Sequence, residues 1–250
     1  MRSLVLVLFV IFISCNSENA PDCFQTSGDT VEVEYQLEEF TKLRAETDVI
    51  VYIKQGDEYK ATLRTGENLL SEALIEVQDG VLVLRNDTRC NLLREYGNFE
   101  VFVTVPNLTE IRHNSAREIY SDGTLVFPDL YLVSNTSINL DVILRKTGEF
   151  HLDLDTENLR IDANGKSVFY MTGEAENMKL GFQNENPRFE GRDFVVQNID
   201  IYHRAPNKMI INPQQSLTGV ITGTGDVIAV NRPPVVDVEE RYTGRLIFEE

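Results

Sequence analysis

The feature that most restricts the fold of this chain is a series of short turns that recurs at steps of about 20 residues from residue 106 onward. Each turn is rich in small or polar residues and precedes a few apolar ones. One set begins near residues 113, 134, 163, 183, 203 and 222, and reads HNSAREI, SNTSINL, ANGKSVF, QNENPRF, HRAPNKMI and TGTGDVI. A second set falls between them: SDGTLVF, KTGEFHL, TGEAENM and GRDFVV. Two turns per repeat predict a β-solenoid, in which each coil buries its apolar face only by stacking on its neighbours.

Two details of this series carry further predictions. The step from residue 134 to residue 163 is long, so we expect an extra strand, DTENLRID, or a bulge in that coil. The last turn contains Gly223 and Gly225, and a phosphate-binding G-x-G turn would need a helix after it. VIAVNRPP follows instead and predicts a short strand. We therefore interpret both glycines as turn residues that supply a positive φ or room for close backbone stacking.

The first third of the chain alternates apolar and polar residues with period two, which is typical of strands. The alternating segments are TVEVEYQLEEF, VIVYIKQGDEYKATLR, ALIEVQDGVLVLRN and FEVFVTVP. Asp79-Gly80 is a two-residue hairpin signal, and TRCNLLREYGN reads as a loop that Cys90 ties to the N-terminus. No helical stripe of apolar residues is present. The sequence predicts an all-β protein, with a β-strand meander over 28–105 running into solenoid repeats over 106–250 as one continuous domain.

The N-terminus has the pattern of an export signal. One basic residue precedes an apolar run from Leu4 to Ile13 that is too short to span a bilayer, and Ser14-Cys15 follows directly. The junction resembles a bacterial lipobox, although Phe12 stands where that pattern usually has an aliphatic residue. We predict a lipoprotein signal peptide over 1–14, lipidation of Cys15 and a tether over 15–27. The alternative is an ordinary secretory signal that leaves Cys15 free.

Export from the cytosol makes a disulfide between Cys23 and Cys90 the expected state of the two remaining cysteines. A metal site is not expected, because neither a C-x-x-C nor an H-x-x-x-H spacing occurs. His113, His151 and His203 lie far apart in the sequence, and we interpret each as a solvated or hydrogen-bonded surface residue.

Length and charge bound the class of protein. About 235 residues remain after the leader, which suits a single all-β domain. The formal net charge is −17, and loss of Arg2 with the leader makes it −18. Nucleic acid and anionic lipid headgroups would be repelled, so neither is an expected partner; the charge itself is consistent with solubility in the cell envelope.

Several stretches resemble the head GIN domain family of proposed auto-transporter adhesins from Gram-negative bacteria. They are DVIVYIKQGDEYKATLR, IEVQDGVLVLRN, RCNLLREY, VFVTVPNLTEIRHNSAREI, MTGEAENMKL and SLTGVITGTGDVIAVNRPP, and together they span nearly all of the mature chain. The turns of that family are typically richer in Gly-Ser-Gly or Gly-Ala-Ser than HNSAREI, QNENPRF and HRAPNKM are. The resemblance implies a right-handed β-helix-like fold, related in shape to pectate lyases, with no recognised catalytic residues and a role in adhesion.

An enzyme is not expected. A β-helical polysaccharide lyase needs carboxylates that bind Ca²⁺ and a Lys or Arg that takes a proton. In HLDLDTENLRID, Asp153 and Asp155 alternate with leucines, so both carboxylates should face solvent rather than form such a site. We predict no catalytic residues, no cofactor and no metal.

Two classes of function remain open, with a degenerate lyase-like enzyme as a further alternative. The first is an adhesin or binding module that presents exposed aromatic rings to a glycan or protein, for which Tyr120, Tyr131 and Tyr202 are the candidate surface residues. Burial of these rings in the core is the competing interpretation. The second is a structural envelope protein that associates with itself through an edge coil, as a possible homo-oligomer. In either case the expected location is the outer membrane or cell surface of a Gram-negative bacterium, held by the lipid anchor.

Overall fold

The computed structural model describes residues 23, 25–88, 90, 97–135 and 145–249. Within them the protein is all-β, as predicted: 17 strands form one connected sheet, and a short 3-10 helix, η2 (Glu67–Glu72), follows β4. No helix in this described part is long and apolar enough to cross a membrane. Cys15 and the leader lie outside the described residues.

The strands of the N-terminal part are short. They are β1 (Thr30–Gln36), β2 (Lys42–Thr47), β3 (Ile50–Gln55), β4 (Lys60–Gly66), β5 (Ala73–Gln78), β6 (Val81–Asn86), β7 (Phe99–Val105), β8 (Glu110–Ser115) and β9 (Ile119–Ser121). Eight strands follow, and four of them are much longer, with 13 to 16 residues. They are β10 (Asp129–Ser134), β11 (Glu149–Ala163), β12 (Val168–Phe182), β13 (Arg188–His203), β14 (Met209–Ile221), β15 (Val227–Ala229), β16 (Val235–Glu240) and β17 (Leu246–Phe248).

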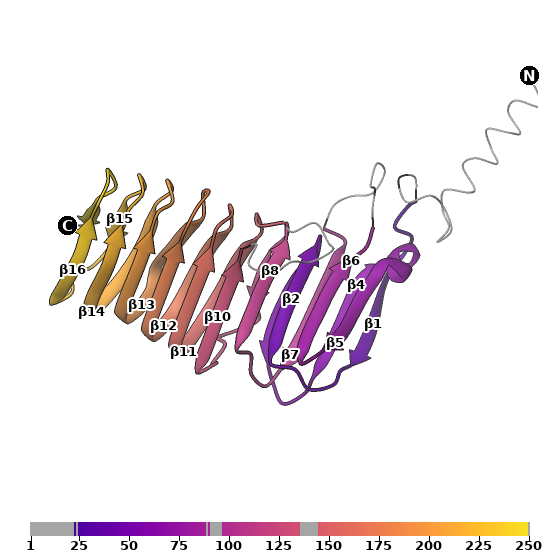
Figure 1. The fold of residues 1–250 in the computed structure, drawn as a ribbon. Helices are drawn as coiled ribbons and strands as arrows, with labels where there is room; N and C mark the ends of the chain where they lie inside the picture. Colours follow the sequence, from indigo (N-terminus) through magenta and orange to yellow (C-terminus); the bar gives the residue numbers. More distant parts are fainter. Residues whose placement is uncertain (1–22, 24, 89, 91–96, 136–144, 250) are drawn as a thin grey trace, which may run out of the picture.

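These strands pair in two ladders that share the long strands β11 to β14. The first ladder runs β1, β4, β7, β3, β9, the first halves of β11 to β14, β15 and β17. The second runs β5, β6, β2, β8, β10, the second halves of β11 to β14, and β16. Apart from the antiparallel pairs β1–β4, β4–β7 and β5–β6, all pairings are parallel. Figure 1 shows the second ladder as a row of strands, from β16 at the C-terminal end to β2 and β6.

The predicted meander over 28–105 is wrong. The β5–β6 hairpin forms as expected, with Asp79 and Gly80 at φ 51° and 75°. However, β3 and β4 do not pair with each other, because β7 lies between them, parallel to β3 and antiparallel to β4. The inward residues Val101 and Val103 of β7 pair with Val51 and Ile53 of β3, and all four are fully buried. Period-two alternation identifies the inward side of a strand, but it carries no information about which strand lies next to it.

The predicted extra strand DTENLRID is also wrong. These residues belong to β11 and pair in register with β10 on one side and β12 on the other, as Tyr131, Arg160 and Lys179 illustrate. The additional residues of the long step lie before β11, in the connection from Ser134 to Glu149, and the central part of it, 136–144, is outside the described residues.

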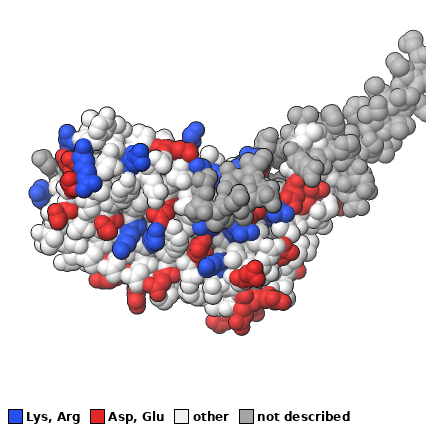
Figure 2. Space-filling view, in the orientation of Figure 1, with Lys and Arg blue, Asp and Glu red and all other residues white. Residues whose placement is uncertain are grey.

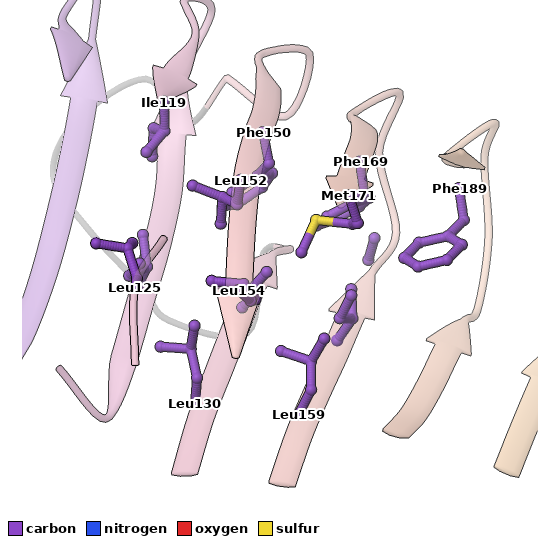
Figure 3. Packing of buried hydrophobic residues seen from close by; sticks show 14 of the residues in the cluster. Ile119, Leu125, Leu130, Phe150, Leu152, Leu154, Leu159, Phe169, Met171 and Phe189 are labelled. Carbon is purple, nitrogen blue, oxygen red and sulfur yellow. The ribbon is translucent and has the colours of Figure 1, made fainter. Parts of the chain in front are cut away.

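The core consists of residues that repeat at the same register position on successive strands. Ile119, Phe150, Phe169 and Phe189 pair in this order along the first ladder, and each is fully buried (Figure 3). The rings of Phe150 and Phe169 stack with centroids 4.7 Å apart. Burial of one such side chain stabilises the fold by about 1.5–3 kcal/mol. Since the neighbours of each ring stand on adjacent strands, no single repeat could bury its apolar face alone.

The turn with Gly223 and Gly225 joins β14 to β15, and a strand follows it as predicted. Neither glycine has a positive φ. A Cβ on Gly225 would lie 2.0 Å from the carbonyl oxygen of Asn207, and one on Gly223 would lie 2.4 Å from that of Arg204. These glycines are therefore required by the close approach of stacked turns, which is the second of the two reasons proposed from the sequence.

The disulfide between Cys23 and Cys90 is present, with the two Cα atoms 4.6 Å apart. It closes a long stretch of chain and restrains the segment before β1. The prediction from the cysteine count is confirmed.

Candidate functional site

Five aromatic rings form a stacked column on the outward side of the first ladder. In order of contact they are Phe102 of β7, Tyr52 of β3, Tyr120 of β9, His151 of β11 and Tyr170 of β12. Successive ring centroids are 4.8, 5.2, 4.9 and 4.6 Å apart, and the planes of neighbouring rings differ by 9° to 23°. We call this set the aromatic column.

Strand geometry explains the column. Tyr52 stands between the buried Val51 and Ile53, so alternation directs its ring outward. Parallel in-register pairing then places Tyr52 beside Tyr120, and Tyr120 beside His151. Each stacked pair contributes about 0.5–1.5 kcal/mol beyond its burial. The column is thus a structural element as well as a potential binding surface.

The two ends of the column differ. At one end the guanidinium carbon of Arg64 lies 5.0 Å from the centroid of Phe102, and Arg64 is held by Glu100 through a 2.7 Å hydrogen bond. At the other end the next register position after Tyr170 is Glu190, and no described ring or guanidinium stacks on the second face of Tyr170. Inner rings have both faces covered and present only their edges. Tyr170 is 39% exposed, and we call its second face, on which no described ring or guanidinium stacks, the free face.

A groove of about 480 Å³ lies beside Tyr170. His151, Asp153, Tyr170, Glu190, Arg192 and Asp193 contribute to its lining, together with Ser121 and Thr172. We call it the Tyr170 groove.

One wall of the groove is made by a β-bulge. The register between β12 and β13 shifts after the pair Tyr170–Glu190, and Gly191, Arg192 and Asp193 then stand opposite two residues of β12. A bulge bends the strand and redirects its side chains. Arg192 and Asp193 are both exposed there, between the buried Gly191 and Phe194.

The charges that line the groove are unequally paired. Arg192 donates two hydrogen bonds to the carboxylate of Glu249, one of them 2.7 Å long from Nη2 to Oε1. This contact raises the pKa of Arg192 and lowers the pKa of Glu249. Glu190 accepts a hydrogen bond from Arg188. Asp153 and Asp193 form no ion pair with any described residue, although the charge of Asp193 helps to raise the pKa of Arg192.

The three tyrosines predicted as a surface do not lie together. Tyr120 belongs to the aromatic column, with Tyr52 and His151 on its two faces. Tyr131 and Tyr202 stand on β10 and β13 in the second ladder, separated by two strands.

Tyr131 and Tyr202 differ in exposure and contacts. The Tyr131 hydroxyl donates a 2.7 Å hydrogen bond to Asp162, and the Arg160 guanidinium carbon lies 4.8 Å from its ring centroid. Burial, together with Asp162, raises the pKa of Tyr131 to about 12. Tyr202 is 41% exposed and is an isolated ring among the described contacts. Sequence reasoning therefore selected one member of the column and missed Phe102, Tyr52, His151 and Tyr170.

The view in Figure 2 shows no surface of a single sign over the C-terminal half of the protein. Basic and acidic side chains are mixed there, while acidic ones gather along the lower edge of the N-terminal half. Local ion pairs account for part of this mixture: Arg160 contacts Asp162 at 2.6 Å, and Lys146 contacts Glu185 at 2.6 Å.

The carboxylates and histidines divide into exposed and buried groups. Leu152 and Leu154 are buried, so Asp153 and Asp155 face outward as expected. No group of three potential metal ligands occurs among the described residues.

His113 and His203 are fully buried, which corrects their interpretation as surface residues. Burial lowers the pKa of His113 to about 4 and also lowers the pKa of His203.

Comparison with known proteins gives one family and several similar folds. A family model described as "Putative auto-transporter adhesin, head GIN domain" matches residues 39–233. No curated protein matches the chain. A solved putative adhesin from Bacteroides fragilis NCTC 9343 is 16% identical, with a TM-score of 0.78, over 90% of this chain and 99% of that one.

Two further structures are similar over comparable lengths. A putative adhesin from Parabacteroides merdae ATCC 43184 is 18% identical with a TM-score of 0.58, over 88% of this chain and 97% of that one. A putative lipid binding protein from Parabacteroides distasonis ATCC 8503 is 10% identical with the same TM-score and the same coverage. At these identities the likeness concerns the fold alone.

Proposed function

This chain belongs to the family described as "Putative auto-transporter adhesin, head GIN domain", and we propose that it is a non-enzymatic binding module that holds a glycan in the Tyr170 groove. The observation that carries the proposal is the free face of Tyr170. The C–H face of a sugar can stack on an aromatic face, but not on the ring edges that the inner members of the column present.

The polar lining of the groove supports the same ligand class. A glycan site combines an apolar platform with a few polar groups that fix orientation. Asp153 and Asp193 can accept hydrogen bonds from sugar hydroxyls, and Thr172 offers a hydroxyl. The groove is open rather than enclosed, and an open groove suits part of a longer chain.

We propose that the fold over 106–250 is a right-handed β-solenoid. The parallel register of β11 to β14, in which residues about 20 apart in sequence lie side by side, supports this description. In such an arrangement the groove lies on the side of the stack, where a long ligand can reach it.

The proposed location is the outer membrane or cell surface of a Gram-negative bacterium. The support comes from the apolar run that ends at Ser14-Cys15, which would be processed as a lipoprotein signal over 1–14 and lipidated at Cys15. The tether over 15–27 would then lead to the disulfide at Cys23 and the N-terminal end of the sheet.

A structural role through self-association is the second candidate. Among the described strands, β16 and β17 each pair on one side only, and Val235 and Val236 of β16 are 54% and 37% exposed. An open edge of this kind can take another strand. Its residues Asp237, Glu239 and Glu240 repel a second copy, so we rank this candidate below glycan binding.

A degenerate lyase activity ranks third. Such an enzyme needs a Lys or Arg that can take a proton from the substrate. Arg192, the arginine that lines the groove, is held by two hydrogen bonds to Glu249.

A glycan array tests the proposal. We expect the wild-type protein to bind one class of glycan and Tyr170→Ala to lose at least about tenfold in affinity, because the substitution removes the ring face that borders the groove. Tyr202→Ala is the matched control, since Tyr202 is equally exposed but lies on the second ladder. Equal binding by wild type and Tyr170→Ala, or no binding to any glycan, would show that the proposal is wrong.

A further inference from the structure

We infer that the ligand of the Tyr170 groove is an amino sugar with a protonated, non-acetylated amine. This inference rests on the proposed function and names the chemical class of the glycan. It follows from the charges around the free ring face.

The unpaired charge in the groove is negative. Arg192 is hydrogen-bonded to Glu249, Glu190 accepts a hydrogen bond from Arg188, and Nε2 of His151 lies 2.9 Å from a carboxylate oxygen of Glu149. Asp153 and Asp193 remain without an ion pair among the described residues. A bound group therefore meets two carboxylates that form no ion pair, beside an Arg192 that is hydrogen-bonded to Glu249 and also interacts electrostatically with Asp193.

The bulge in β13 brings the two carboxylates to the same groove from different strands. Asp153 extends outward from β11, two residues after His151 of the column. Asp193 belongs to the bulged segment of β13, opposite β12, which carries Tyr170. Both side chains and the ring line the same groove.

An aromatic ring face and a carboxylate both attract a cation. The face of a tyrosine ring attracts an ammonium group through its quadrupole, and the carboxylates add charge-assisted hydrogen bonds. A hexosamine with a free amine supplies both the C–H face and the ammonium group. A uronic acid would place a carboxylate beside Asp153 and Asp193, and a protein with a net charge of −17 would also slow its approach.

Calorimetric titration with three oligosaccharides tests this inference. The probes are glucosamine tetramer, N-acetylglucosamine tetramer and a galacturonic acid tetramer, each at pH 6. We expect the glucosamine tetramer to bind about tenfold more tightly than its acetylated form, and the galacturonate not to bind.

Two variants separate the charge effect from the ring effect. Asp153→Asn combined with Asp193→Asn should abolish the preference for the free amine while the acetylated tetramer still binds. Asp155→Asn is the matched control, because this exposed carboxylate lies on the same strand but outside the groove lining, and it should leave the preference unchanged.

The outcomes distinguish the inference from the proposed function. Equal affinity for both glucosamine forms, or tighter binding of the galacturonate, overturns the inference and leaves glycan binding intact. Absence of binding by all three probes, together with no binding on the array, overturns both.

Discussion

Replacing Gly225 by alanine adds a single carbon atom at the place where the last turns stack most closely. An ideal Cβ there would lie 2.0 Å from the Asn207 carbonyl oxygen, 2.7 Å from Nε2 of His203 and 2.8 Å from the Ala205 carbonyl oxygen. Two of the three atoms are backbone, so no rotation of a side chain relieves the overlap. The Gly225 N–H also donates to the Ala205 carbonyl oxygen at 3.1 Å, and a shift of the turn would weaken that hydrogen bond.

We expect Gly225→Ala to lower the free energy of unfolding by about 2–3 kcal/mol, the range typical of overpacking in a tightly packed site. For a domain of this size the melting temperature should fall by about 4–12 °C. Urea denaturation followed by circular dichroism measures the first quantity, and calorimetry measures the second.

Gly80→Ala is the control for this prediction. Gly80 has a φ of 75° but nothing within 4 Å of an added Cβ, so its substitution tests backbone strain without a steric clash. We expect a loss of about 1 kcal/mol there. If Gly225→Ala unfolds like the wild type, or no differently from Gly80→Ala, close stacking of the turns is not the reason for the glycine. Addition of ATP or NAD should leave the melting temperature of the wild type unchanged, and a rise would support a nucleotide site instead.

Three further predictions concern the anchor, the disulfide and a buried histidine. Palmitate labelling should tag the wild type, and Cys15→Ala should lose the label and the membrane fraction together; a variant that stays membrane-bound would contradict the lipid anchor. Cys90→Ser should lower the free energy of unfolding by about 2–4 kcal/mol in urea titrations. An unchanged urea midpoint of unfolding would show that the disulfide does not stabilise the fold. The folded-state pKa of His113 is depressed to about 4, so its contribution to stability is present above pH 6.5 and is lost as the pH falls toward 4. The loss should reach about 3 kcal/mol, and His113→Phe should reduce it; an identical pH dependence in that variant would refute the assignment.

Local features of the fold could be predicted because each depends on a few adjacent residues. Asp79-Gly80 specifies a two-residue hairpin by its backbone preferences alone, and the turn at Gly223 and Gly225 is recognisable because an apolar strand, not a helix, follows it. The pairing of Cys23 with Cys90 followed from export and an even count.

The candidate site could not be predicted, because it depends on which strands become neighbours. Tyr52 and Tyr120 are brought into contact by the pairing of β3 with β9, with β4 to β8 between them in the sequence. The sequence left open whether Tyr120 faces outward or lies in the core, and an outward position would not reveal that both ring faces are covered. The free face of Tyr170 depends in addition on Glu190 at the next register position, which only the pairing of β12 with β13 determines.

The prediction that His113 and His203 lie at the surface was wrong for a related reason. An isolated histidine is usually exposed, and nothing near His113 in the sequence indicates burial. In the fold its ring contacts Phe150, with centroids 5.0 Å apart, and its Nδ1 accepts a hydrogen bond from the Ser115 N–H at 3.2 Å. The contact with Phe150 comes from another strand, so it follows from the stacking of strands rather than from local sequence.

The most direct test of the account is a crystal structure of the protein with the oligosaccharide that binds best in titration. We expect a sugar ring parallel to Tyr170 on its free face, with an amine or hydroxyl within hydrogen-bond distance of Asp153 or Asp193. An oligosaccharide bound on the second ladder at Tyr131 or Tyr202, or along the open edge of β16, with the Tyr170 face uncovered, would contradict it.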